Sequence, residues 1–178
     1  MPTILLLALG VLAAACLAAA GRQDVLRVQR SVHIEAAPEH IAPLIANLRR
    51  FNTWNPFCAK GQALTYTGPE SGPGAACGFA GSRAAGRGSL TVIDAAPGKI
   101  AMRLNMTAPM RCENTIEFLL SPGIGGTEVS WTMQGESPFI AKLMGLVVDT
   151  DRMCGRDVET GLAALKAQAE APDALAAA

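Results

Sequence analysis

The stretch RCENTIEFLLSPGIGGTEVSWTM, residues 111–133, decides the fold. Apolar and polar residues alternate along both of its halves, and Gly125 and Gly126 lie between the halves. A period of two predicts half-buried strands, and a glycine pair predicts the tight turn of an antiparallel hairpin. The residues expected on the dry face are Cys112, Asn114, Ile116, Phe118 and Leu120 in the first half, and Val129, Trp131 and Met133 in the second.

The same alternation continues the sheet toward the N-terminus. Residues 100–107 predict a strand with Met102 and Leu104 on the dry face, and residues 26–35 predict a first strand with Val28, Val32 and Ile34 on that face. Between them, residues 68–88 contain many glycines, which punctuate short strands and allow strong bending. We expect one curved antiparallel sheet.

Two segments have helical periodicity. Pro38 opens an expected helix that runs up to Arg50. Residues 138–170 predict a long amphipathic helix, and only the dry face of the sheet is available to cover its apolar stripe. The fold class expected is therefore α+β, a curved sheet wrapped around a long C-terminal helix. The stripe consists of Ile140, Leu143, Met144, Val147, Cys154, Val158, Leu162 and Leu165.

The chain starts with an apolar segment. Residues 3–20 carry no charge, a length that spans a bilayer at about 1.5 Å per residue. We expect residues 1–24 to be a transmembrane anchor or a signal segment, residues 25–170 to be the domain, and residues 171–178 to be a flexible tail. A single-pass anchor and export after cleavage at the alanines before Gly21 both remain open. Arg22, Arg27 and Arg30 favour a cytoplasmic domain.

Charge and cysteine spacing exclude several classes of protein. Fifteen basic residues balance fifteen acidic ones, so nucleic-acid binding is not expected. The cysteines lie too far apart for a CxxC motif, so neither a zinc site nor another metal site is expected. Gly86-Arg87-Gly88 precedes a strand rather than a helix, so it is not a phosphate loop, and no cofactor is expected. Free, buried thiols are the interpretation favoured for the cysteines.

Several short motifs resemble those of one family. They are Arg30-Ser31, Ala37-Pro38, Trp54-Asn55-Pro56, residues 66–69 (YTGP), Gly86-Arg87-Gly88, residues 127–131 (TEVSW) and residues 161–166 (GLAALK). Over residues 25–170 the chain resembles the polyketide cyclase/dehydrase-like group of the START-related SRPBCC superfamily, which has the helix-grip fold. The resemblance implies a cavity between sheet and C-terminal helix that accepts lipids, polyketides or sterol-like molecules. It does not imply one reaction.

Polar residues on the dry faces are candidates for a site. Asp151 interrupts the apolar stripe of the last helix, and Arg30 and Asn114 share the dry parity of their strands. A buried carboxylate requires a partner. One hypothesis is that Asp151 pairs with Arg30 or Asn114 and orients a ligand; the alternative is that Asp151 only bonds backbone or water at the sheet edge. The candidate apolar lining comprises Trp54, Phe79, Met102, Leu104, Phe118, Trp131, Met133, Met144 and Val147.

Three functions are consistent with this pattern. The first is binding or transport of a hydrophobic small molecule by a membrane-tethered or exported protein. The second is a cyclase or dehydratase with Asp151 as general acid or base. The third is an interaction module that binds no ligand. No GxSxG or HExxH motif is present, so standard hydrolase chemistry is not expected.

Overall fold

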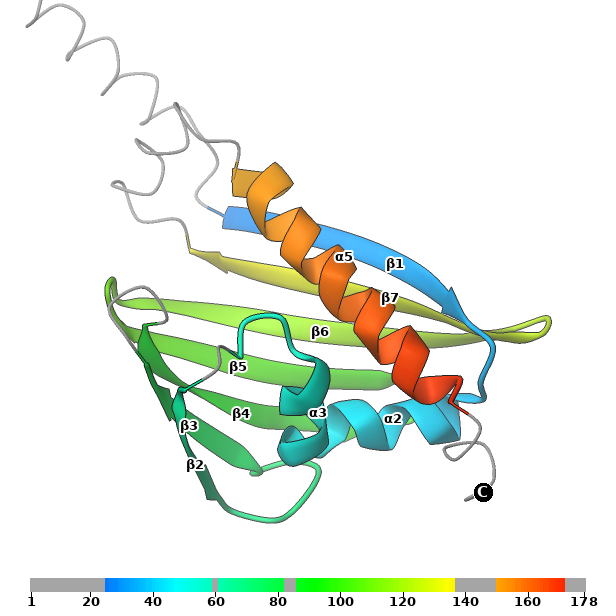
Figure 1. The fold of residues 1–178 in the computed structure, drawn as a ribbon, viewed down its shortest axis with the longest axis horizontal. Coiled ribbons are helices and arrows are strands. Elements are labelled where there is room, and N and C mark those ends of the chain that lie inside the picture. Colours follow the sequence, from blue (N-terminus) through cyan, green and yellow to red (C-terminus); the bar gives the residue numbers. More distant parts are fainter. Residues whose placement is uncertain (1–24, 59–60, 82–85, 137–149, 172–178) are drawn as a thin grey trace, which may run out of the picture.

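A computed structural model describes residues 25–58, 61–81, 86–136 and 150–171. The seven strands within these ranges form one antiparallel sheet (Figure 1). The strands lie side by side in the order β1-β7-β6-β5-β4-β3-β2. Their bounds are β1 Val25–Ile34, β2 Ala63–Thr67, β3 Ala76–Ala80, β4 Arg87–Ala96, β5 Lys99–Ala108, β6 Cys112–Gly123 and β7 Gly126–Glu136. The expected meander is confirmed, and the hairpin of residues 111–133 forms β6 and most of β7.

The sheet is bent along β4. The register between β4 and β5 shifts at Arg87/Gly88 and again between Val92 and Asp94. Such bulges increase the local twist and turn a strand toward one face. Gly88 also permits a close approach, because a Cβ atom there would collide with the carbonyl oxygen of Asn105 and the ring of Phe79. The sheet therefore has a concave face, which carries the core.

The segment expected as one helix forms two. Helix α2 covers Pro38–Ala46 and helix α3 covers Leu48–Trp54. Asn47 lies between them with an extended backbone, and its side-chain oxygen accepts hydrogen bonds from the backbone N–H groups of Arg49 and Arg50. Asparagine is a preferred N-cap residue, so it ends one helix and begins the next. This break turns α3 across the concave face (Figure 1).

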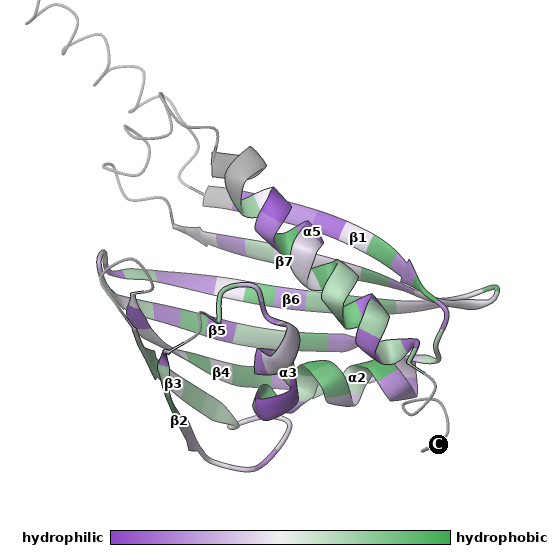
Figure 2. Cartoon of the chain, viewed as in Figure 1, coloured by the Kyte–Doolittle hydropathy of each residue, from purple (hydrophilic) through white to green (hydrophobic). Residues whose placement is uncertain are grey.

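Helix α5, Thr150–Ala169, packs against β1 and the concave face. Its side chains Val158, Leu162 and Leu165 are buried, and apolar residues gather in its C-terminal half and in α2 (Figure 2). Gly161 faces the sheet, where a Cβ atom would lie 2.8 Å from the Cδ atom of Pro56 and 2.8 Å from Cζ3 of Trp131. The absence of a side chain there lets the helix touch the sheet. The helix-grip architecture expected from the sequence is confirmed.

Several expectations fall outside the described residues. These are the N-terminal apolar segment, the first part of the helix expected from Pro138, and the tail after residue 171. Within the described ranges, no helix is both long enough and apolar enough to cross a membrane.

We predict that Gly161→Val destabilises the fold by about 1–3 kcal/mol, because the new side chain must displace Pro56 and Trp131. The matched control is Ala163→Val, which introduces the same side chain at an exposed position of the same helix. Urea unfolding of both variants measures the difference. Equal stabilities would show that the contact between α5 and Trp131 is not tight.

Candidate functional site

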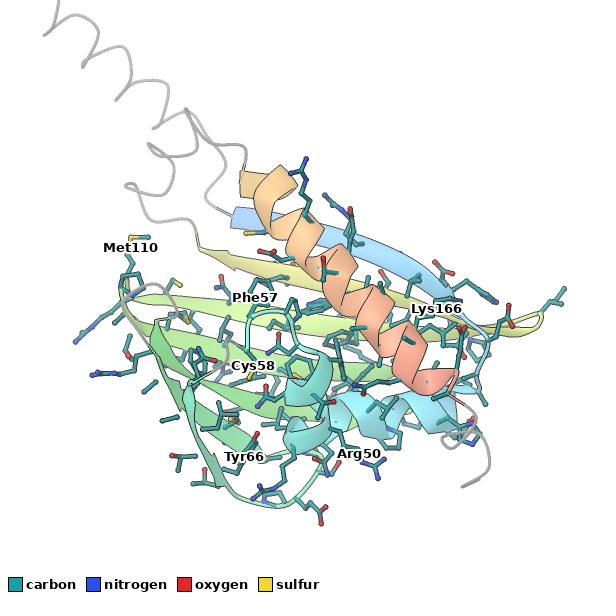
Figure 3. All side chains as sticks on the ribbon, viewed as in Figure 1. Arg50, Phe57, Cys58, Tyr66, Met110 and Lys166 are labelled. Atoms are coloured by element: carbon teal, nitrogen blue, oxygen red, sulfur yellow. The ribbon has the colours of Figure 1, made fainter. Side chains whose placement is uncertain are left out.

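A cavity of about 430 Å³ lies between the concave face of the sheet and α3 with the segment that follows it. Strands β2 to β7 supply one wall, and residues within 51–58 together with Gln62 supply the other. Figure 3 shows Phe57 and Cys58 on that segment, above the sheet. The lining residues are Phe51, Asn52, Asn55, Phe57, Cys58, Gln62, Leu64, Cys77, Phe79, Leu90, Leu104, Met106, Ile116, Trp131 and Met133.

Aromatic rings close the cavity on the side of α5. The ring centroids of Phe51 and Trp54 are 4.7 Å apart, and those of Phe118 and Trp131 are 4.9 Å apart. The centroids of Trp54 and Trp131 are 5.8 Å apart, and the rings meet edge to face. These distances fall in the range of favourable aromatic pairs. We call these four residues the aromatic cluster; it fills the concave face beside α5 and leaves the space beyond it open.

The two walls of the cavity differ in polarity. The strand wall is mostly apolar, whereas α3 and the following segment contribute the amides of Asn52, Asn55 and Gln62. Asn52 donates from Nδ2 to the hydroxyl of Tyr66 at 3.1 Å and to Sγ of Cys77 at 3.4 Å. Hydrogen bonds to buried polar groups hold these side chains in place. Among the described residues that line the cavity, none carries a charge.

Asn55 shapes the turn after α3. Its Oδ1 atom accepts a hydrogen bond from the backbone N–H of Phe57 at 3.1 Å, and its carbonyl oxygen accepts one from the N–H of Cys58 at 3.1 Å. Asparagine readily forms such local turns. The turn carries Phe57, which is 41 % exposed, over the cavity.

Two cysteines line the cavity as free thiols. Burial raises the pKa of the Cys58 thiol above its ordinary value. Burial also raises the pKa of the Cys77 thiol, although the hydrogen bond from Asn52 opposes the rise. Desolvation disfavours the thiolate, so both groups are neutral at neutral pH and behave as small apolar groups. Cys112 and Cys154 are half-buried, so of these four described cysteines only Cys77 is fully buried.

Of the residues proposed from the sequence as apolar lining, Phe79, Leu104, Trp131 and Met133 border the cavity. Three others lie in the solid core instead. Met102 and Phe118 are fully buried, and Trp54 is buried with its Nε1 donating to the carbonyl of Leu44 at 2.9 Å. They support the cavity without bordering it. Met144 and Val147 lie outside the described residues.

The polar candidates lie elsewhere. Arg30 donates from Nε to Oε1 of Glu159 at 2.8 Å, and its guanidinium packs against Gly155 of α5, where a Cβ atom would collide with it. Asn114 donates from Nδ2 to Sγ of Cys112 at 3.7 Å. Neither borders the cavity. Asp151 belongs to the first turn of α5, but its side chain is not among those described, so its pairing with Arg30 or Asn114 stays a prediction.

The sequence interpretation did not single out two groups of lining residues. Leu64, Cys77, Leu90, Met106 and Ile116 are strand residues, and the period-two pattern could have identified Met106 and Ile116, which share the parity of chosen neighbours. The second group lies on α3 and the irregular segment after it, where no periodicity indicates which side chains face inward. It consists of Phe51, Asn52, Asn55, Phe57, Cys58 and Gln62.

Comparisons with known proteins agree with this architecture. Residues 25–170 match the model of the family described as polyketide cyclase/dehydrase and lipid transport. No curated protein matches the chain.

Three solved structures show the same fold. The Aha1 protein of Colwellia psychrerythraea is 17% identical, with 82% of this chain and 96% of that chain covered and a TM-score of 0.58. Ara h 8.0201 is 9% identical; the match covers 82% of this chain and 97% of that chain, with a TM-score of 0.57. DynU16, from the dynemicin biosynthetic locus, is 14% identical; the match covers 83% of this chain and 49% of that chain, with a TM-score of 0.54.

Proposed function

Because the chain belongs to the polyketide cyclase/dehydrase and lipid transport family, we propose that it binds an uncharged, largely apolar small molecule in the cavity beneath α3. The observation that carries this proposal is the composition of the lining. Apolar strand residues form one wall, amides and neutral thiols lie on or near the other, and no described lining residue is charged. A charged ligand group would lose its hydration there without gaining a partner.

The size of the cavity limits the ligand. A volume of about 430 Å³ lies in the lower part of the range of small-molecule sites. Met106 and Met133 border it, and methionine side chains adapt to ligands of different shape. These features favour a compact ring system or a short chain over a two-chain lipid.

The lining also bears on the choice between carrier and enzyme. General acid–base catalysis requires a proton-transferring group whose pKa lies near the working pH. The described lining contains no carboxylate, imidazole or amine, and burial raises the pKa values of the Cys58 and Cys77 thiols. These observations support binding or transport as the first function.

We predict that Leu104→Trp weakens binding of the fluorescent probe 1-aminoanthracene about ten- to hundredfold, because the larger side chain occupies the cavity and overpacking costs about 1–3 kcal/mol. Leu119→Trp is the matched control, since Leu119 is 39 % exposed and does not border the cavity. Fluorescence titration measures both affinities. Equal weakening in the two variants, or none, would contradict binding in this cavity.

A cyclase or dehydratase is the second candidate, because the family description names these enzymes beside lipid transport. In that case Asp151, on the first turn of α5, is the proposed general acid or base. We predict that Asp151→Asn leaves the affinity for 1-aminoanthracene within about twofold, because a neutral probe gains little from a carboxylate. If polyketide-like substrates are converted, the same variant lowers turnover by about 10²- to 10⁴-fold. Unchanged turnover would exclude this role for Asp151.

The N-terminal segment supports a membrane location as part of the proposal. Residues 3–20 are uncharged, and β1 begins at Val25, shortly after them. Met133 borders the cavity and pairs with Val28, near the start of β1. An anchored chain would therefore hold this end of the sheet close to the bilayer, where apolar molecules are concentrated.

We predict that the full chain stays in the membrane fraction after alkaline carbonate washing. Leu9→Arg with Leu12→Arg releases it, because each arginine near the middle of the segment costs about 2.5–3.5 kcal/mol in the bilayer. Leu119→Arg, on the exposed face of the sheet, is the control and stays bound. Intact-mass measurement of a mature chain that lacks the first residues would show a cleaved signal instead of an anchor.

A further inference from the structure

One end of the sheet lies next to the N-terminal segment in the chain. Strand β1 begins there, and only residues 21–24 separate Val25 from the uncharged residues 3–20. Five peptide links reach at most about 18 Å, so an anchored chain keeps this end of the sheet nearest to the bilayer. We call it the Val25 end. The strand pairings place there Val25, Ala63, Ala80, Arg87, Ala108, Cys112 and Glu136.

The cavity opens toward the Val25 end. On β3 the buried Cys77 is followed toward that end by the half-buried Phe79. On β7 the buried Trp131 is followed in the same direction by the half-buried Met133. Phe57, on the other wall, is 41 % exposed. Exposure that rises in one direction along separate strands indicates the side on which the cavity meets its surroundings.

A second large apolar side chain is exposed at this end. Met110, in the turn between β5 and β6, is 38 % exposed and projects from the end of the sheet (Figure 3). Met106 borders the cavity and pairs with Cys112 at the base of the same turn. The turn therefore belongs to the rim of the cavity. Exposed apolar side chains beside a binding cavity indicate contact with an apolar partner.

Arginines accompany this apolar rim. Arg111 follows Met110 directly, and Arg87 begins β4 opposite the end of β5; both side chains are exposed. Within the described ranges neither has a carboxylate at ion-pair distance, whereas Arg103, further along β5, pairs with Glu113 at 3.3 Å. Two guanidinium groups at the rim are thus available to an external anion.

The opposite end of the sheet has a different charge. Its exposed residues Glu35, Asp94 and Glu128 are acidic, and the cations there, Lys99 and Lys166, are each paired with a glutamate. Basic side chains next to exposed apolar ones match a bilayer with anionic headgroups, because arginine binds phosphate and apolar side chains enter the acyl region. An acidic protein would also match the arginines, but the short connection to residues 3–20 makes the bilayer the nearest surface.

We propose that the Val25 end of the sheet docks on an anionic bilayer, with Phe57 and Met110 in the outer acyl region and Arg87 and Arg111 on lipid phosphates. The cavity then opens directly onto the bilayer surface. This inference rests on the membrane location and the cavity binding proposed above, and it adds the surface and the lipid class that bring the two together.

The test places a photoreactive group at each end of the sheet. Met110→p-benzoylphenylalanine in the full chain is reconstituted in liposomes of phosphatidylcholine with phosphatidylglycerol and irradiated. Intact-mass spectrometry then measures the fraction of chains that carry one lipid. The matched control is Ile124→p-benzoylphenylalanine, because Ile124 is fully exposed at the tip of the β6–β7 hairpin, at the opposite end. We expect lipid adducts at position 110 and none above background at position 124.

A charge reversal tests the role of the anionic headgroups. Added to the position-110 variant, Arg111→Glu is expected to lower the adduct yield about two- to fivefold, since one basic residue contributes about a factor of five to attraction by an anionic surface. The yield in pure phosphatidylcholine is expected to change little. Arg50→Glu is the control, because Arg50 is exposed on α3 and lies away from Met110 (Figure 3).

The outcomes separate this inference from the proposed function. Equal adduct yields at positions 110 and 124, or none at either, would overturn docking by the Val25 end. Equal effects of Arg111→Glu and Arg50→Glu would overturn the role of anionic lipid. If the probe titration with Leu104→Trp fails while position 110 still forms adducts, the proposed function fails and the docking surface stands.

Discussion

The contact between Gly161 and the indole of Trp131 is the constraint on which the architecture depends. It brings the backbone of α5 down onto the sheet at one place, and the aromatic cluster fills the space beneath and beside it. Such a close approach is possible only where the helix has no side chain. The concave face is thereby divided into a solid part beside α5 and a hollow part beneath α3. The cavity bordered by described residues belongs to the second part, so the described part of α5 supports it rather than covers it.

Polar contacts hold α5 in the same place along β1. The guanidinium of Arg30 on β1 forms an ion pair with Glu159 of α5. Near the end of the helix, Nζ of Lys166 donates a hydrogen bond to the carbonyl of His33 at 2.8 Å. The bond from Lys166 and the backbone N–H of Glu35 lower the pKa of the Glu170 carboxyl. A lowered pKa in the folded state means that this contribution is present at neutral pH and is lost as the pH falls through that pKa. Arg30, Lys166 and Glu170 are half-buried and Glu159 is exposed, so solvent screens these ion pairs and they orient the helix more than they stabilise it.

The sequence was sufficient to predict the fold because its signals are periodic. The alternation in residues 111–133 fixes which side chains of β6 and β7 face the core, and the register of Phe118 with Trp131 follows from the hairpin. Parity identifies a face but not a position along it. Met102 and Leu104 share one face of β5, yet Met102 lies in the core and Leu104 borders the cavity. Arg30 shows a related limit, since its side of β1 is covered by α5, where Glu159 accepts its hydrogen bond. The residues of the segment after α3 follow no period, so only coordinates place them.

The position of the two tryptophans has a spectroscopic consequence. Trp54 and Trp131 are the only indoles of the chain, and both belong to the aromatic cluster, of which Phe51 and Trp131 border the cavity. Tryptophan fluorescence from this protein therefore originates at one place rather than averaging over the molecule. At a centroid separation of 5.8 Å the two rings exchange excitation, so any event that changes the surroundings of one alters the signal of both. The chain carries its own optical reporter beside its cavity, without an added label.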